Sequence, residues 1–437
     1  MNSVPGNLPT IVAGVRTPFV RSHGAYADLS SFDLGRIVLS GLVAKTGIET
    51  GEIDLVTMGT VLHEPRTPNV ARESVLGAGF PATIPAYTVS LACISSNVAA
   101  TNIADMIQLE RIKVAIFGGT DTCSDPPIRF SPKLRKLLVK ISKAKGTMGY
   151  MRELKSLASF KAKDFAPDVP QVTEFSNGKS MGEGAEVLAQ QLSVTREQSD
   201  LFALRSQQNA LQAYENKVYE NDLIHVQAPP RFRTIEKDEG PRADTTLEAL
   251  TKLRPAFDKK FGVATAGSSS FLTDGASAVL MMSLAEAHQR GYTPYSILKD
   301  HVYRAGDALT EMLSGPAMTI PCLLAKNNLD YDDIGVWEIH EAFACQVVAN
   351  LNLIADKDFV SSRLHLDKKW AGHIPMEKLN LWGGSLSLGH PFGATGGRLL
   401  WTASRRLQEE NQRYAVVSGC AAGGHGSAIL LENPNFS

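Results

Sequence analysis

Short runs of apolar and β-branched residues recur along the chain and alternate with longer segments of helical periodicity. The runs are TIVAGV, LVTMGTVL, KVAIFGG, VWEIHEAF and YAVVSG. Strands that are apolar at every position, and not only at alternate ones, are typical of sheets covered by helices on both faces. The pattern therefore predicts an α/β architecture.

Two parts of the chain repeat one arrangement. Residues 93–119 run from Cys93 through a segment of small residues, which predicts a helix, to the strand KVAIFGG. Residues 390–424 run from His390 through the helical segment ATGGRLLWTASRRLQEE to the strand YAVVSG and a glycine cluster. A chemically reactive side chain thus precedes a small-residue helix in each half, which indicates a duplicated topology.

Residues 126–261 differ in composition, with Pro-rich turns and many charges, and predict an inserted region outside both sheets. Within them, residues 133–163 carry many lysines and arginines against a single acidic residue, Glu153. Apolar residues recur there at helical spacing and predict two amphipathic helices separated by Gly146. Two interpretations stay open: a solvated hairpin packed on its own domain, or a basic surface for anionic lipid or a partner subunit.

Composition limits the class of protein without naming a reaction. The 437 residues suffice for two or three domains, and the formal net charge of −1 gives no reason to expect nucleic acid as a partner. Five widely spaced cysteines do not suggest a disulfide framework. We see no secretory signal pattern, and no apolar run approaches the roughly 18 residues that span a bilayer. We therefore expect a cytoplasmic protein with reduced thiols.

Candidate chemistry begins with two residues. Cys93 precedes a predicted helix, whose N-terminus lowers a thiol pKa, although a lone cysteine is more often a packing residue. His390 lies in NLWGGSLSLGHPFGATGG, between Gly389 and Pro391. Glycines there allow close approach of the backbone to a ligand, which is unlike the setting of a core histidine. The segment contains neither GxxxxGK nor GxGxxG, so it is not a phosphate loop.

Two further segments carry reactive side chains. In SGCAAGGHG a buried strand ends at Cys420 and turns through Ala422 and two glycines. Such a turn can direct backbone N–H groups to one point, as an oxyanion hole requires. In EIHEAFACQ, His340 and Glu341 close the strand VWEI, although a lone histidine in that position is more often structural.

Together these four segments resemble the thiolase family. Thiolases carry a nucleophilic cysteine before a small-residue helix, an NEAF box, a GGxxxxGHPxGxxG box and a C-terminal CxGGG-like turn. The matching positions here are Cys93, His340–Phe343, Gly383–Gly396 and Cys420–Gly424. Segments 180–186, 238–258 and 265–283 also match, so the resemblance covers nearly the whole chain.

The resemblance implies a fold of two duplicated βαβαβαββ halves, stacked in five layers, with an inserted loop domain. We expect the N-terminal half in residues 1–125 and 262–285, the loop domain in 126–261, and the C-terminal half in 286–437. The basic helical segment 133–163 then belongs to the loop domain.

Two departures from the family pattern refine the expected function. His340 replaces the Asn of NEAF, and Ala422 replaces a glycine. The combination of HEAF, CAAGG and the basic insert is similar to thiolases that form the β subunit of a fatty-acid oxidation complex. Ser180 stands where short-chain biosynthetic thiolases carry a histidine. The resemblance therefore implies the degradative branch, which cleaves 3-ketoacyl-CoA with CoA to acetyl-CoA and a shortened acyl-CoA.

The family also implies roles for individual residues. His390 would deprotonate Cys93, which forms an acyl-enzyme, and Cys420 would act as the acid and then the base. His390 would hold the enolate oxygen together with either a water or a direct contact from His340, and the N–H groups of Cys93 and Ala422 would hold the second oxyanion. Arg242, Phe257 and Ser270 are the expected CoA contacts.

Coenzyme A is expected as a substrate, with no bound cofactor and no metal. The expected partners are a second copy of the chain, as a homodimer, and an α subunit with enoyl-CoA hydratase and 3-hydroxyacyl-CoA dehydrogenase activity. Peripheral membrane contact through 133–163 is a further possibility. Cys123, Cys322 and Cys345 are interpreted as packing residues.

Three alternatives stay open. A biosynthetic acetoacetyl-CoA thiolase is the nearest, and activity on C4 against longer substrates separates it. A ketoacyl synthase of the same fold is disfavoured by Cys420 in its glycine turn. A catalytically idle scaffold is disfavoured by the intact set of Cys93, His390 and Cys420.

Overall fold

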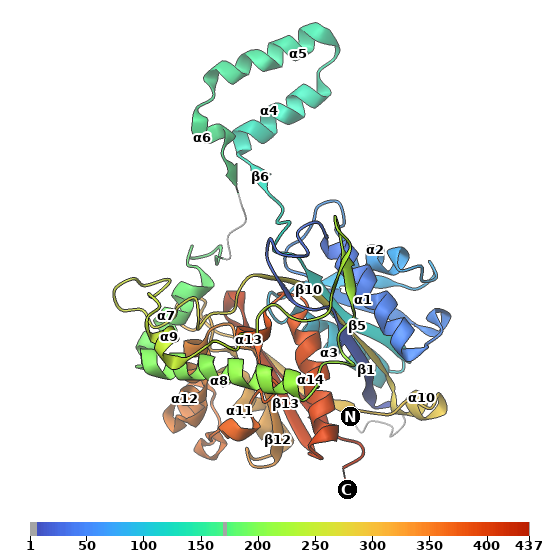
Figure 1. The fold of residues 1–437 in the computed structure, drawn as a ribbon, viewed down its shortest axis with the longest axis vertical. Coiled ribbons are helices and arrows are strands. Elements are labelled where there is room, and N and C mark those ends of the chain that lie inside the picture. The colour runs from blue at the N-terminus through green and yellow to red at the C-terminus, as the bar shows by residue number, and fades with distance from the viewer. Residues whose placement is uncertain (1–6, 169–172, 437) are drawn as a thin grey trace.

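The computed structural model describes residues 7–168 and 173–436 and contains one large sheet flanked by helices (Figure 1). The sheet has ten strands in the order β12-β13-β14-β11-β1-β10-β5-β3-β4, and β2 (Val20–Arg21) pairs with β10. The other strands are β1 (Pro9–Arg16), β3 (Leu55–Gly59), β4 (Ala86–Val89), β5 (Val114–Asp121), β10 (Thr273–Ser283), β11 (Ser296–Ala305), β12 (Ile334–Ile339), β13 (Tyr414–Ala421) and β14 (His425–Glu432).

The strand order confirms the duplicated topology. In the N-terminal half β3 pairs with β5 in parallel, and β5-β10-β1 follow as antiparallel neighbours. In the C-terminal half β12 pairs with β13 in parallel, and β13-β14-β11 repeat the antiparallel series. The two half-sheets join through a short antiparallel pairing of β1 with β11, in which Thr10 faces Ile297.

The helices form the remaining layers of the expected five-layer fold. Helices α3 (Ser95–Gln108) and α14 (Thr395–Glu409) pack against each other and against strands of both halves. The two helices approach so closely that a β-carbon at Gly396 would collide with Asn97 of α3. The N-terminal half-sheet is covered by α1 (Ser31–Thr46) and α2 (Val70–Gly77). The C-terminal half-sheet is covered by α11 (Gly315–Asn327), against which α12 (Ala344–Ala355) packs.

The inserted region divides into two parts. Helices α7 (Met181–Gln191) and α8 (Arg196–Glu215) pack against α12, and α9 (Leu247–Thr251) packs against α8. The other part is a helical hairpin of α4 (Pro132–Lys143) and α5 (Gly146–Lys155), followed by α6 (Ala162–Phe165). A ribbon of β6 (Arg129–Phe130) and β7 (Pro167–Asp168) connects it to the body, from which it stands apart in Figure 1.

The hairpin matches the two amphipathic helices expected within 133–163. Its helices contact each other, but Leu137 is the only residue of α4 that is buried, and no residue of α5 is. The apolar face of the hairpin therefore lies largely in solvent.

Smaller elements of the body are the β8 (Val226–Ala228) and β9 (Arg233–Ile235) pair, α10 (Leu284–Gln289) and α13 (Ser385–Leu388). None of the described helices is long and apolar enough to cross a membrane.

Candidate active site

Cys93 lies on the turn between β4 and α3, two residues before the helix begins. Ala92 has a φ of 45°, in the left-handed region that non-glycine residues rarely adopt. The Ser95 hydroxyl stabilises this turn, since it accepts a hydrogen bond from the Leu91 N–H (2.8 Å) and donates one to the Ala92 carbonyl (2.7 Å). These residues therefore form a sharp turn that places the Cys93 sulfur at the N-terminal end of α3.

The environment of the Cys93 sulfur favours the thiol in the resting protein. Burial raises the pKa of Cys93 to about 12, and backbone hydrogen bonds from the N–H groups of Cys93 and Ala422 act in the opposite direction. The two N–H groups expected to form an oxyanion hole therefore lie at the sulfur. Neither is strong enough to ionise the thiol alone, so a base must take its proton.

His390 is buried in the loop that precedes α14. Its Nδ1 lies 2.7 Å from the Thr395 hydroxyl, and its backbone N–H donates to the Thr273 hydroxyl at 3.1 Å. Within residues 7–168 and 173–436, its Nε2 has no hydrogen-bond partner. Burial, with His340 and Arg398 nearby, holds the pKa of His390 well below its ordinary value. A neutral imidazole with one free nitrogen is thus available as a base.

Asp121 and Ser96 bring the two loops together. The buried Asp121 carboxylate, at the end of β5, accepts hydrogen bonds from the Leu62 N–H at 2.9 Å and the Gly393 N–H at 2.5 Å. The Ser96 hydroxyl donates to the Gly393 carbonyl. Because Gly393 lies three residues after His390, these contacts fix the histidine loop beside the start of α3.

His340 follows β12 and lies directly beside His390. The centroids of the two rings are 4.1 Å apart, and the ligating atoms of Cys93, His340 and His390 all lie within 4.8 Å of one another. The Asn380 side chain fixes the backbone just before His340, since its amide pairs with both the N–H and the carbonyl of Ile339. Burial lowers the pKa of His340 to about 3, with Arg398 as a further cause, so this ring is neutral as well.

Cys420 completes the group. It is buried near the end of β13, and burial, followed by the nearby Cys93 sulfur, raises the pKa of its thiol. Cys93, His390, Cys420 and Ala422 line one cavity of about 400 Å³. The remaining lining is mainly apolar and comes from both halves and the insert: Thr173, Ser180, Met181, Gly182, Phe257, Ser269, Ser270, Leu272, Leu313, Ala342, Phe343 and Phe392.

The three expected CoA contacts fall in two places. Phe257 and Ser270 line the cavity, and the Phe257 ring packs edge-on against Phe343 with centroids 5.7 Å apart. Arg242 is exposed and does not line the cavity. Burial, followed by the charge of Arg242, lowers the pKa of the Arg21 guanidinium, so the two charges act on each other.

Arg21 was not predicted from the sequence. Its guanidinium lies 4.1 Å from the centroid of the Phe271 ring, and the neighbouring Ser270 and Leu272 line the cavity. Two guanidinium groups whose charges act on each other are suited to a phosphate group. Nothing in the sequence around Arg21 marks it, because its proximity to Arg242 arises only from the tertiary fold.

The chain matches the thiolase N-terminal domain over residues 10–285 and the thiolase C-terminal domain over residues 292–433. It belongs to the thiolase family. The protein is thus an acyltransferase, and the family and fold expected from the resemblance are confirmed.

Named relatives resemble this thiolase over nearly its full length. It is 43% identical to a mitochondrial trifunctional enzyme subunit beta of Bos taurus, over 97% of this chain and 87% of that one. It is 44% identical to a probable 3-ketoacyl-CoA thiolase of Caenorhabditis elegans, over 98% and 94% of the two chains. For a 3-ketoacyl-CoA thiolase of Pectobacterium carotovorum the identity is 39%, over 98% and 97%.

A solved structure also resembles this thiolase. The acetyl-CoA acetyltransferase of Bacillus anthracis superposes with a TM-score of 0.81 and 29% sequence identity, covering 98% of each chain. The similarity extends over both halves of the fold.

Proposed function

We propose that this thiolase cleaves 3-ketoacyl-CoA with CoA to acetyl-CoA and a shortened acyl-CoA, as in fatty-acid β-oxidation. The observation that carries the proposal is the single apolar cavity lined by Cys93, His390 and Cys420. Relatives named 3-ketoacyl-CoA thiolase at 44% and 39% identity support the same substrate class.

In the first half-reaction, His390 Nε2 takes the Cys93 proton as the sulfur attacks C3 of the substrate. The C2–C3 bond breaks, so the acyl group stays on Cys93 and an acetyl-CoA enolate leaves. Cys420 donates its thiol proton to C2 of this enolate and becomes a thiolate. The enolate oxygen is held by His340 and His390, and the acyl oxyanion by the N–H groups of Cys93 and Ala422.

In the second half-reaction, the Cys420 thiolate takes the proton of the incoming CoA thiol. The CoA sulfur attacks the acyl carbon, and the Cys93 sulfur leaves and recovers its proton from His390. Both cysteines and the histidine end in their starting protonation states. The raised pKa of Cys93 and the lowered pKa of His390 favour this neutral resting state.

The cavity lining supports substrates longer than four carbons. Ser180 lines the cavity where biosynthetic thiolases place a histidine, and its hydroxyl accepts the Glu183 N–H as the N-cap of α7. Apolar side chains such as Met181 and Leu313 supply the surface that an alkyl chain requires. The alternative, an acetoacetyl-CoA thiolase, needs only a C4 substrate.

The test is thiolysis of a chain-length series of 3-ketoacyl-CoA esters by the wild type, Cys93→Ala and the control Cys322→Ala. Cys322 is a buried cysteine of α11 that does not line the cavity. We expect Cys93→Ala to bind substrate but to lose turnover by several orders of magnitude, and Cys322→Ala to keep it. Near-normal turnover by Cys93→Ala would refute the nucleophile, and activity confined to C4 would favour the biosynthetic alternative.

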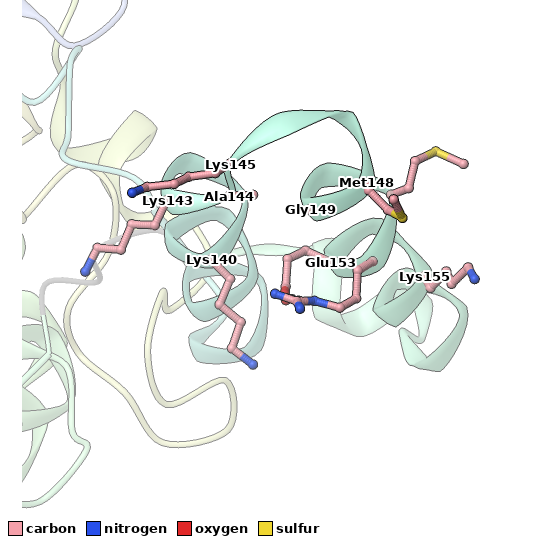
Figure 2. Close-up of a pocket in the computed structure, with 10 residues that line it drawn as sticks. Lys140, Lys143, Ala144, Lys145, Met148, Gly149, Glu153 and Lys155 are labelled. Atoms are coloured by element: carbon pink, nitrogen blue, oxygen red, sulfur yellow. Dashed lines mark hydrogen bonds and ion pairs between the residues drawn. The ribbon is translucent and has the colours of Figure 1, made fainter.

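We further propose that the α4–α5 hairpin contacts an anionic membrane surface. Lys140, Lys143 and Lys145 extend from one part of the hairpin and Met148 and Lys155 from another (Figure 2). The exposed fractions of Met148 and Met151 are 85% and 61%. Lysines on the same hairpin as exposed apolar side chains are suited to a negatively charged lipid interface, where each cation contributes about 1 kcal/mol.

Vesicle co-sedimentation tests this surface. We expect binding to phosphatidylcholine vesicles that contain phosphatidylglycerol, and loss of binding in the triple variant Lys140→Glu, Lys143→Glu, Lys145→Glu. The control reverses three exposed lysines of the body, Lys217, Lys252 and Lys357. Equal binding by both variants, or binding of the hairpin to an α subunit but not to vesicles, would contradict a lipid role.

We also propose a homodimer and an α subunit as partners. Relatives named as a subunit beta support the second partner. The first is supported by β4, which ends the large sheet and has four half-buried residues along an edge that natural sheets usually cover. Sedimentation tests the dimer, and a species with the mass of one chain, 47.2 kDa, would contradict it.

A further inference from the structure

Arg398 of α14 is buried, and among the described residues it forms no ion pair with a carboxylate. Its exposed fraction is 2%, and its Nη2 donates to the Ser385 hydroxyl at 3.0 Å. Across residues 7–168 and 173–436, its Nε and Nη1 have no hydrogen-bond partner. The charges of Glu338 and Glu341 act to raise the pKa of Arg398, but these carboxylates form their hydrogen bonds with Arg406 (2.8 Å) and Ser206 (2.7 Å). A buried cation whose Nε and Nη1 lack hydrogen-bond partners is costly to the fold.

Ser385 connects this guanidinium to His340. The Ser385 Oγ lies 3.0 Å from His340 Nδ1 and also accepts from Arg398. Since a guanidinium only donates, the single hydroxyl proton of Ser385 is free to point to Nδ1. If Nδ1 carried a proton instead, the buried hydroxyl proton would have no acceptor among the described residues. The arrangement therefore favours the His340 tautomer with its proton on Nε2.

The contacts of His390 favour the opposite tautomer, with the proton on Nδ1. The Thr395 hydroxyl donates to the Pro391 carbonyl at 2.9 Å, so the Thr395 oxygen has no proton left for the ring. It accepts from His390 Nδ1, which lies 2.7 Å away. The free Nε2 of His390 is then an acceptor, while the free Nε2 of His340 is a donor.

We propose that Arg398 and Ser385 are positioning residues that hold His340 as the Nε2–H tautomer, so that the two adjacent imidazoles present one hydrogen-bond donor and one acceptor to the substrate. The inference rests on the proposed function, because the donor acts on the substrate oxygen that becomes the enolate. The family motif has an Asn at position 340, whose amide donates without any tautomer to select. The replacement by His340 makes a tautomer-selecting partner necessary.

The charge of Arg398 has a second effect in the same direction. It lies near both rings and disfavours their protonated forms, and it contributes to the lowered pKa of each. An imidazolium at His340 would oppose proton uptake by His390 only 4.1 Å away between centroids. A neutral donor avoids this conflict.

The first test observes the tautomer directly. Nitrogen-15 NMR of histidine-labelled protein distinguishes Nδ1–H from Nε2–H rings without any turnover. We expect Nε2–H at His340 in the wild type and in Ser387→Ala, which removes an equally buried hydroxyl from the same helix, α13. We expect mixed tautomers in Ser385→Ala and Arg398→Met. A wild-type Nδ1–H ring, or an unchanged ring in Ser385→Ala, would overturn the proposal.

The second test is a double-mutant cycle on kcat. Ser385→Ala is expected to lower kcat about 10- to 100-fold, as loss of a positioning partner does, with little change in KM. In the background His340→Asn, where the amide donates regardless of Ser385, the same substitution is expected to cost about twofold or less. Arg398→Lys, which keeps a charged donor, should recover part of the activity lost in Arg398→Met. Equal losses in both backgrounds would indicate a merely structural serine and refute the coupling.

The two proposals fail in different ways. If 3-ketoacyl-CoA is not a substrate, the wild type shows no thiolysis, but the NMR experiment still reports the tautomer. If the wild type is active and the tautomer does not depend on Ser385, the proposed function stands and this inference falls.

Discussion

His340 and His390 lie with ring centroids 4.1 Å apart, although they come from different loops, one after β12 and the other before α14. Both rings are buried, and the pKa of each is lowered, chiefly by burial. Two cations cannot form at this distance, so at most one of the two neutral rings takes up a second proton and becomes an imidazolium. The site therefore takes up a proton only when negative charge develops beside it, as it does when a thiol is ionised.

Burial of neutral His340 predicts loss of stability in acid. The pKa of this ring is about 3 in the folded protein and about 6.5 when it is exposed, so the unfolded chain binds the proton first. Its contribution to stability is complete above pH 6.5 and declines as the pH falls toward 3, by about 1.4 kcal/mol for each unit of pKa displacement. Urea unfolding at pH 7.5 and pH 5 measures the decline.

The variant His340→Asn serves as the comparison for this titration. It removes the buried ring but leaves other titrating groups such as Glu338, whose pKa burial raises to about 6, so that its protonation favours the folded state as the pH falls. We expect the unfolding free energy of the variant to fall less between pH 7.5 and pH 5 than that of the wild type. Parallel pH profiles would show that His340 does not titrate as a buried neutral group.

Asp121 is expected to couple stability with activity. Asp121→Ala leaves the Val61, Leu62 and Gly393 N–H groups without their acceptor, and such bonds to a charged group are worth about 1.5–3 kcal/mol each. Because Gly393 positions the His390 loop, we expect lower kcat as well as lower stability. Denaturant unfolding and steady-state thiolysis measure the two effects.

Asp121→Asn separates shape from charge at this position. It keeps the size of the side chain and one acceptor oxygen, so we expect an intermediate loss of stability. It also removes the negative charge that contributes to the raised pKa of Cys93. Alkylation of Cys93 should then proceed faster at a given pH than in the wild type, and a slower reaction would contradict the electrostatic part of the argument.

The reactive residues could be predicted because each lies in a distinctive local pattern. Cys93, His340, His390 and Cys420 stand beside glycines, small residues or strand ends, and the duplicated arrangement placed two of them at equivalent helices. The roles assigned to them, the absence of a bound cofactor and the cytoplasmic location stay predictions.

The residues that support the reactive side chains could not be predicted from the sequence. Asp121 contacts Gly393 across 272 positions, and Arg398 of α14 bonds to Ser385 of α13, 13 positions earlier, across the intervening loop. Their types are ordinary for a strand end and a helix, so no local signal marks them. The exposed apolar face of the hairpin was likewise undetermined, since periodicity shows that a face exists but not what covers it.

Arg21 and Arg242 are expected to bind the phosphate end of CoA. Neutralising both guanidinium groups with glutamine should raise KM for CoA about tenfold or more with a small change in kcat, because the phosphates are remote from the reacting carbon. Arg413→Gln, an exposed change at the opposite end of β13 from Cys420, is the control. Weaker dependence of KM on salt in the double variant would support direct charge contact between these residues and CoA. An unchanged KM would show that neither residue binds CoA.

Cys420 can be tested apart from the nucleophile by proton exchange. In heavy water the wild type should replace the acetyl protons of acetyl-CoA with deuterium, because the Cys420 sulfur removes a proton from C2 and returns a solvent-derived one. Cys420→Ala should lose this exchange by about 10²–10⁴-fold, the usual contribution of a general acid or base, while Cys93 is still acylated by substrate. Proton NMR follows the exchange, and mass spectrometry follows the acyl-enzyme. Cys345→Ala, a buried cysteine of α12 outside the cavity, should exchange at the wild-type rate. Retained exchange in Cys420→Ala would show that another group at the cavity removes the C2 proton, and His390 is the residue there best suited to act as that base.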